Sequence, residues 1–185
     1  MQEALGAVLT VCLTVSQGIH LDDRERSAMF TEAQAVWQPH GVAIRQGEAV
    51  NCSRLVFLKS DTEARPEDLA NDAALGWVPF VAGRARRLVF LRVSRAHFLI
   101  GEMSPGTRPE ALTRLLVAKL LGRVLAHELG HVLLNNVKHQ PKGLMRAQYR
   151  AWDLLSAPIS TYTLDAEERA SFFAETGKEV RLAHR

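Results

Sequence analysis

The longest helical pattern in the chain spans residues 109–135, PEALTRLLVAKLLGRVLAHELGHVLLN. Apolar residues recur in it every three to four positions and form a wide stripe, which is typical of a helix buried beneath a sheet. A capping box between Thr107 and Glu110 is expected to start this helix. Asn135 and Asn136 are expected to end it, because asparagine tolerates the left-handed backbone conformation.

The last two turns of this helix contain residues 127–131, HELGH, which match the pattern H-E-x-x-H. Two histidines four residues apart, here His127 and His131, project from one face of a helix, so both imidazoles can bind the same Zn²⁺ ion. The carboxylate of Glu128 is expected to lie beside the ion and to accept a proton from water. The apolar surroundings favour this interpretation over a pair of hydrogen-bonded core histidines.

A catalytic zinc site needs a third protein ligand, because the fourth position is left to water. His139 follows His131 by eight residues, and a reversal of the chain after the helix can bring it back to the ion. It is the preferred third ligand. The alternatives are Asp153 and a glutamate of a later helix, Glu167 or Glu168, and the residue pattern leaves them open.

This combination resembles the metzincin zinc peptidases, including matrixin-like and archaeal-type members. The shared features are H-E-x-x-H, a nearby third histidine and a methionine turn further along the chain. The resemblance implies zinc ligands at His127, His131 and His139, a general base at Glu128, and Met145 in a turn beneath the metal.

The spacing departs from the usual metzincin form, H-E-x-x-H-x-x-G-x-x-H. Leu134 and Val137 occupy the positions of the glycine and the third histidine, so His139 comes two residues late. The tyrosine that often follows the methionine by two residues is replaced by Ala147. Tyr149 lies four residues after the methionine and is a candidate to take its place.

Strand and helix patterns alternate before the long helix. Buried strands are expected over 8–15, 42–45 and 54–59, and a helix over 22–37 that a capping box of Asp22 and Glu25 starts. Residues 60–73 are polar and indicate a loop or short helix, and a final helix is expected over 165–175. The pattern predicts an α/β (α+β) zincin-like fold with a twisted, mostly parallel sheet.

Two further strands, over 75–81 and 88–93, are expected to form a hairpin around residues 82–87. Pro79 cannot donate a ladder hydrogen bond, so the first of these strands belongs at the sheet edge. By the resemblance, it is an antiparallel edge strand above the zinc cleft, to which an extended peptide can pair. Gly76 and Trp77 would then lie near the substrate, or else Trp77 simply packs in the core.

Composition indicates one globular domain, residues 1–185, with 47% hydrophobic and 23% charged residues. A formal net charge of +3 is too small to indicate a nucleic-acid partner. No run of about 18 apolar residues indicates a membrane span. The apolar start of the chain has no basic segment typical of a signal peptide. We expect a soluble monomer, secreted if the chain is a mature fragment and otherwise cytoplasmic.

Cys12 and Cys52 are the only cysteines, and both lie in or beside expected strands. Two cysteines do not define a disulfide framework, so they are expected to be buried free thiols, with a disulfide between neighbouring strands as the alternative. Neither lies near the zinc motif.

Together these features predict a zinc metallopeptidase with one catalytic Zn²⁺ ion and a peptide or protein substrate. One alternative is a zinc-dependent amide hydrolase or a toxin-like enzyme that acts on another substrate. The other is a catalytically silent binding protein on a zincin scaffold. Glu128 argues against the silent form, because a structural zinc site has no use for a base beside an open coordination position.

Overall fold

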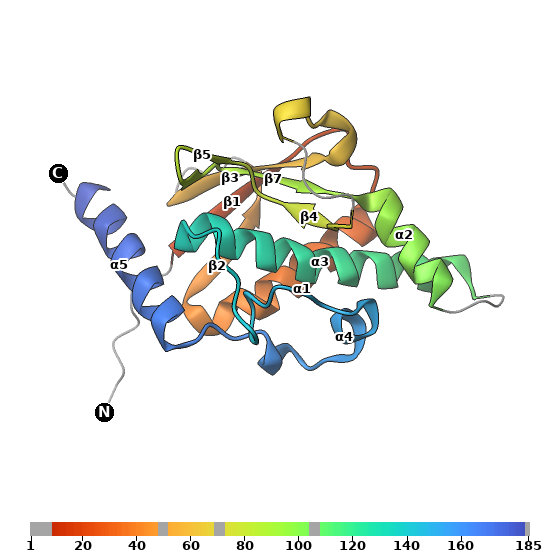
Figure 1. Cartoon of the computed structure of the whole chain (residues 1–185). Coiled ribbons are helices and arrows are strands. Elements are labelled where there is room, and N and C mark those ends of the chain that lie inside the picture. Colours follow the sequence, from red (N-terminus) through yellow and green to blue (C-terminus); the bar gives the residue numbers. More distant parts are fainter. Residues whose placement is uncertain (1–8, 48–51, 69–72, 104–107, 184–185) are drawn as a thin grey trace.

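The computed structural model describes residues 9–47, 52–68, 73–103 and 108–183 (Figure 1). Its main sheet has five strands in the order β2-β1-β3-β7-β4. They are β1 (Leu9–Val15), β2 (Val42–Gln46), β3 (Arg54–Ser60), β4 (Gly76–Trp77) and β7 (Leu88–Leu91). The first four strands in this order are parallel, and β4 is antiparallel to β7. The predicted mostly parallel sheet with an antiparallel edge strand is therefore confirmed.

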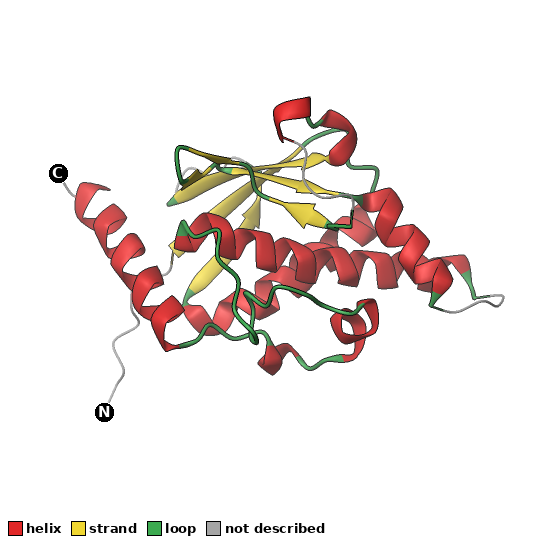
Figure 2. Cartoon of the chain, viewed as in Figure 1, coloured by secondary structure: helices red, strands yellow, loops and turns green. Residues whose placement is uncertain are grey.

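Five α-helices accompany the sheet in the part of the chain that the structure describes. They are α1 (Asp23–Trp37), α2 (Val93–Glu102), α3 (Glu110–Leu134), α4 (Ala151–Ser156) and α5 (Ala166–Ala183). Figure 2 shows α1 and α3 together beneath one face of the sheet. Short 3₁₀ turns occur at Gln38–His40, Asp61–Glu63, Pro66–Asp68 and Ile159–Thr161.

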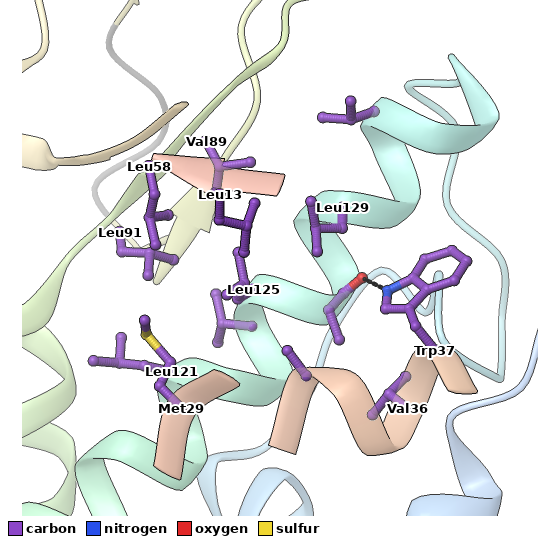
Figure 3. Packing of buried hydrophobic residues seen from close by; sticks show 14 of the residues in the cluster. Leu13, Met29, Val36, Trp37, Leu58, Val89, Leu91, Leu121, Leu125 and Leu129 are labelled. Atoms are coloured by element: carbon purple, nitrogen blue, oxygen red, sulfur yellow. Dashed lines mark hydrogen bonds between the residues drawn. The ribbon is translucent and has the colours of Figure 1, made fainter. Parts of the chain in front are cut away.

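The core lies between the sheet and these two helices (Figure 3). Leucines of α3, such as Leu125 and Leu129, are fully buried against strand residues such as Leu13 and Leu58. The indole nitrogen of Trp37, at the end of α1, donates a hydrogen bond of 2.9 Å to a carbonyl of α3. The apolar stripe of α3 thus packs where its sequence pattern indicates, and the packing orients the histidine-bearing end of the helix.

The helix ends partly follow the sequence expectations. The capping box of Asp22 and Glu25 starts α1 as expected. Asn135 ends α3 with a left-handed backbone (φ 48°), and its N–H bonds to the carbonyl of His131. The expected capping box of α3 is not observed, because Pro109 is the cap residue and provides no side-chain hydrogen bond; Thr107 lies outside the described residues.

The expected strand over 75–81 is wrong as a single element. Its first part is the edge strand β4, whereas β5 (Phe80–Val81) pairs with β6 (Arg84–Ala85) in a separate two-stranded sheet. Pro79 lies between the two parts. The hairpin turn is also tighter than expected, because Ala82 and Gly83 adopt positive φ angles of 50° and 74°.

Other boundaries also differ from the sequence expectations. The β7 strand ends at Leu91 because α2, which the pattern did not predict, begins at Val93 and buries Ala96 and Ile100. The final helix begins at Ala166 and is longer than expected. Position 8, the expected start of the first strand, and residues 69–72 of the expected loop lie outside the described residues.

The two cysteines correct an expectation. Cys12 and Cys52 form a disulfide, so the prediction of free thiols is wrong. Cys12 lies on β1, whose neighbour β3 begins two residues after Cys52, and this parallel pairing of β1 and β3 brings the two thiols together. Among the described residues, no helix combines the length and apolar character needed to cross a membrane.

Candidate metal centre

The metal centre predicted from the motif lies at the C-terminal end of α3. His127 and His131 project from its last two turns. After Asn135 the backbone reverses, and the side chain of Asn136 accepts a hydrogen bond of 2.9 Å from the N–H of Lys138. This turn directs His139 back toward the helix. Asn135 adopts the left-handed conformation that glycine usually adopts, so it takes the role of the glycine that the usual motif has near this point.

The three imidazoles converge. One nitrogen from each of His127, His131 and His139 lies within 4.8 Å of the other two. The Nε2 atoms of His131 and His139 are 3.2 Å apart. Two Zn–N bonds of about 2.05 Å at a tetrahedral angle place their nitrogens about 3.3 Å apart. The donor set and this spacing fit a tetrahedral zinc ion, and these three residues would hold it.

Backbone carbonyls orient two of the rings. The Nδ1 atom of His127 is 2.7 Å from the carbonyl oxygen of Leu144, and that of His131 is 2.6 Å from the carbonyl oxygen of Asn136. A carbonyl can only accept a hydrogen bond, so both Nδ1 atoms carry hydrogen. The lone pair of each Nε2 is therefore left for a cation, as in most zinc-binding histidines.

Burial also keeps the ligands neutral. It lowers the pKa of His127 to about 3, helped by the charge of His131, and that of His131 to about 4. Burial lowers the pKa of His139 as well, although this side chain is more exposed. Neutral imidazole is the form that binds metals, so the three rings are ready to bind at ordinary pH.

Glu128 is buried beside the histidines, with 6% of its surface exposed. Burial raises the pKa of its carboxyl group to about 8. The edge strand β4 passes close to it, since a Cβ built on Gly76 would lie 3.1 Å from the Cγ of Glu128. A buried carboxyl group with a raised pKa in such a position is typical of a catalytic acid or base.

Met145 lies beneath the helix end. Its side chain is 1% exposed, and a Cβ built on Gly130 would overlap its sulfur atom. Backbone hydrogen bonds hold this turn in place: Gln140 N–H donates to the carbonyl of Met145 at 2.7 Å, and Leu144 N–H to that of Thr163 at 2.9 Å. The methionine is therefore packed against Gly130, between His127 and His131 in the chain, and its role beneath a metal ion stays a prediction.

The alternative third ligands lie apart from the histidine cluster. In the described part of the chain, the only group of three or more suitable side chains is formed by the three histidines. Asp153 is 3.7 Å from Arg146, and Glu168 caps α5 through reciprocal hydrogen bonds with Asp165. Glu167 is exposed in the first turn of α5. The structure therefore favours His139.

One of two aromatic residues from the β4–β5 segment contacts the cluster. The ring of Phe80, on β5, meets His131 edge-on with centroids 6.2 Å apart. Figure 1 shows β5 beside the C-terminal end of α3, and Ala85 N–H of the same hairpin donates to the side chain of Asn135. Trp77 is buried and stacks on Phe90 at 4.9 Å, so it packs in the core, as one of the two alternatives expected.

The orienting groups of the site could not be found in the sequence. The carbonyls of Leu144 and Asn136 belong to the backbone, and a backbone carbonyl has no side-chain signature. The sequence gives only a weak indication that Phe80 contacts the site, since a phenylalanine in a strand usually packs in the core. The Tyr149 hydroxyl lies close to the Leu144 carbonyl, and nothing in the spacing of Tyr149 predicts this contact.

No protein-family model matches the sequence, and no curated protein matches it significantly. Among solved structures, the chain is similar to archaemetzincin from Methanopyrus kandleri, with a TM-score of 0.52. The similarity covers 97% of this chain and 99% of that chain at 13% sequence identity. At this identity the likeness shows the fold alone. The chain therefore has the mixed α/β fold of archaemetzincin, in agreement with the α/β fold and mostly parallel sheet expected from the sequence.

Proposed function

We propose that the chain is a zinc-dependent metallopeptidase. The observation that carries the proposal is the convergence of His127, His131 and His139 within 4.8 Å at the end of α3. The buried carboxyl group of Glu128 belongs to the same turn of the helix. The fold is that of archaemetzincin, whose name agrees with the metzincin resemblance of the motif.

The proposed chemistry divides between the ion and the chain. When bound, zinc supplies Lewis-acid activation of water and of the scissile carbonyl. Glu128 takes the proton that the attacking water loses and passes it to the leaving nitrogen.

The proposed substrate is an extended peptide or protein segment. β4 is the last strand in the sheet order, so no described strand pairs with its outer edge. Gly76 of this strand packs on Glu128, which places the edge beside the proposed base. An extended peptide can pair with such an edge through its main chain. We also propose that the protein acts as a monomer and does not bind nucleic acid. The disulfide favours an oxidising compartment.

Peptide cleavage tests the proposal. Purified protein should contain one zinc ion and cleave a mixed peptide library, and a chelator should abolish cleavage until zinc is restored. Glu128→Ala should retain zinc and fold but lose cleavage, whereas Glu167→Ala, at an exposed position on α5, should cleave normally. If the zinc-loaded wild type cleaves no peptide, the peptidase proposal fails in favour of another amide substrate or a silent binding protein.

A further inference from the structure

One buried carbonyl links the proposed metal ligand His127 to a tyrosine outside the motif. The oxygen of Leu144 lies 2.7 Å from the Nδ1 of His127 and 2.9 Å from the hydroxyl of Tyr149. A carbonyl oxygen has two lone pairs and can accept both hydrogen bonds at once. The hydroxyl also lies 2.5 Å from the carbonyl of Gly143. The single hydroxyl proton of Tyr149 is therefore shared between the two carbonyls that directly precede Met145.

The position of its hydroxyl indicates how Tyr149 acts. It contacts the carbonyl on the Nδ1 side of His127, and the other ring nitrogen, Nε2, is the one left for a cation. The two rings are nearly perpendicular, with centroids 6.0 Å apart. The hydroxyl must donate in this contact, because a carbonyl oxygen can only accept. Tyr149 is thus connected to the metal centre through the carbonyl of Leu144.

Tyr149 is itself held in place. Its ring stacks on Tyr162 at 5.7 Å, and the guanidinium of Arg146 lies over it at 5.6 Å. The hydroxyl of Tyr162 accepts a hydrogen bond of 3.1 Å from Arg123, a buried residue of α3. Arg123 pairs in turn with Glu32 of α1 at 2.6 Å. The Tyr162 ring therefore holds the ring of Tyr149 by stacking, whereas the Tyr162 hydroxyl is engaged by Arg123 and not by Tyr149.

We propose that Tyr149 is a positioning residue of the metal centre. It fixes the Leu144 carbonyl, and through it the imidazole of His127, in the orientation that leaves Nε2 for the ion. This inference rests on the metal-binding part of the proposed function and is independent of hydrolysis. Removal of outer hydrogen-bond partners of metal ligands typically weakens metal binding about 10–100-fold. Tyr149 is one hydrogen bond further from the metal than such a partner, because it contacts Leu144 and not His127 itself. We therefore expect an effect at the lower end of this range.

Tyr149→Phe in the full chain tests the proposal, because it removes the hydroxyl and keeps the ring. Zinc affinity is measured by competition with a chromophoric chelator, and ligand geometry by the visible absorption of the cobalt-substituted protein. We expect zinc affinity to fall about tenfold and the cobalt spectrum to shift. The melting temperature of the metal-free variant shows whether it is folded when these measurements are made.

The matched control is Tyr162→Phe. It removes a hydroxyl from the other ring of the same stacked pair without touching Leu144. It should lower the melting temperature, because Arg123 loses a buried partner, and leave zinc affinity and the cobalt spectrum unchanged. Equal effects of both substitutions on zinc affinity would show general loosening and would overturn the proposal.

Three further outcomes are decisive. If Tyr149→Phe binds zinc like the wild type with the same cobalt spectrum, the positioning role is wrong, even where peptide cleavage is lost. A wild type that binds zinc but cleaves no peptide contradicts only the peptidase proposal, because affinity and spectrum can still be measured. A wild type that binds no zinc contradicts both proposals.

Discussion

Gly76 of the edge strand packs so closely on Glu128 of α3 that a Cβ at position 76 would lie 3.1 Å from the Glu128 Cγ. The same Cβ would lie 2.8 Å from a methyl carbon of Val124, so neighbouring side chains would have to shift. This contact joins the strand proposed to bind substrate to the proposed general base, and it leads to the first prediction.

Gly76→Ala should displace Glu128 and lower kcat more than it raises KM, while zinc content stays at the wild-type level. Overpacking at such a site typically destabilises a protein by about 1–3 kcal/mol. Steady-state kinetics and urea denaturation measure the two effects. Gly101→Ala is the matched control, since a Cβ there meets nothing within 4 Å. Unchanged kinetics in Gly76→Ala would show that Glu128 tolerates the displacement.

The third ligand can be identified by metal content. His139→Ala should lose most of its zinc, because two imidazoles alone do not make a stable catalytic site. Asp153→Ala, at one of the alternative ligands, should retain zinc, since Asp153 lies outside the histidine cluster. Elemental analysis after dialysis gives both values. A full zinc complement in His139→Ala would be incompatible with the proposed ligand set.

The methionine turn is predicted to act by packing. Met145 is 1% exposed and fills the space beside Gly130. Met145→Ala should lower the free energy of unfolding by about 2–5 kcal/mol, whereas Met145→Leu should cost less than about 1.5 kcal/mol and keep zinc affinity. Urea denaturation of both variants measures the difference. Equal stability of the two variants would show that the contact with Gly130 contributes little.

Stability of the metal-free protein should depend on pH in two opposite ways. His127 and His131, with pKa values lowered to about 3 and 4, bind protons more readily when unfolded, so their contribution to stability rises with pH until about 6.5. Glu128, with its pKa raised from 4.5 to about 8, binds its proton more readily when folded, so its contribution falls as pH rises toward 8.

Denaturation of chelator-treated protein at a series of pH values measures both trends. Loss of stability below pH 6.5 should weaken in His127→Ala, which removes one of the buried imidazoles. The decline between pH 6.5 and 8 should disappear in Glu128→Gln, which cannot ionise. A decline of the same size in Glu128→Gln would mean that another group causes it.

The disulfide should contribute substantially to stability. It closes a loop with a sequence separation of 40 residues. The chain-entropy relation gives about 4 kcal/mol for a loop of this length. The double variant Cys12→Ala/Cys52→Ala should show this loss in urea denaturation. Thiol titration of the denatured, unreduced wild type should detect no free cysteine, and two free thiols would contradict the pairing.

Local patterns predicted the elements that depend on neighbours in the chain. The capping box of Asp22 and Glu25 was predicted correctly, because a cap involves residues only three positions apart. The same holds for the end of α3 at Asn135. The strand over 75–81 was predicted wrongly as one element. Its division into β4 and β5 depends on which distant segment each half pairs with, and periodicity does not encode the pairing partner.

Local spacing in the chain is enough to predict the long helix and the shared face of His127 and His131, because helical geometry alone sets the positions of residues four apart. The return of His139 to these two residues follows from the packed fold, as do the contact of the Leu144 carbonyl with His127 and the pairing of Cys12 with Cys52. These contacts depend on how separate segments pack, and one of them involves a backbone atom common to every residue. Their physical basis is therefore the three-dimensional arrangement, which no local pattern specifies.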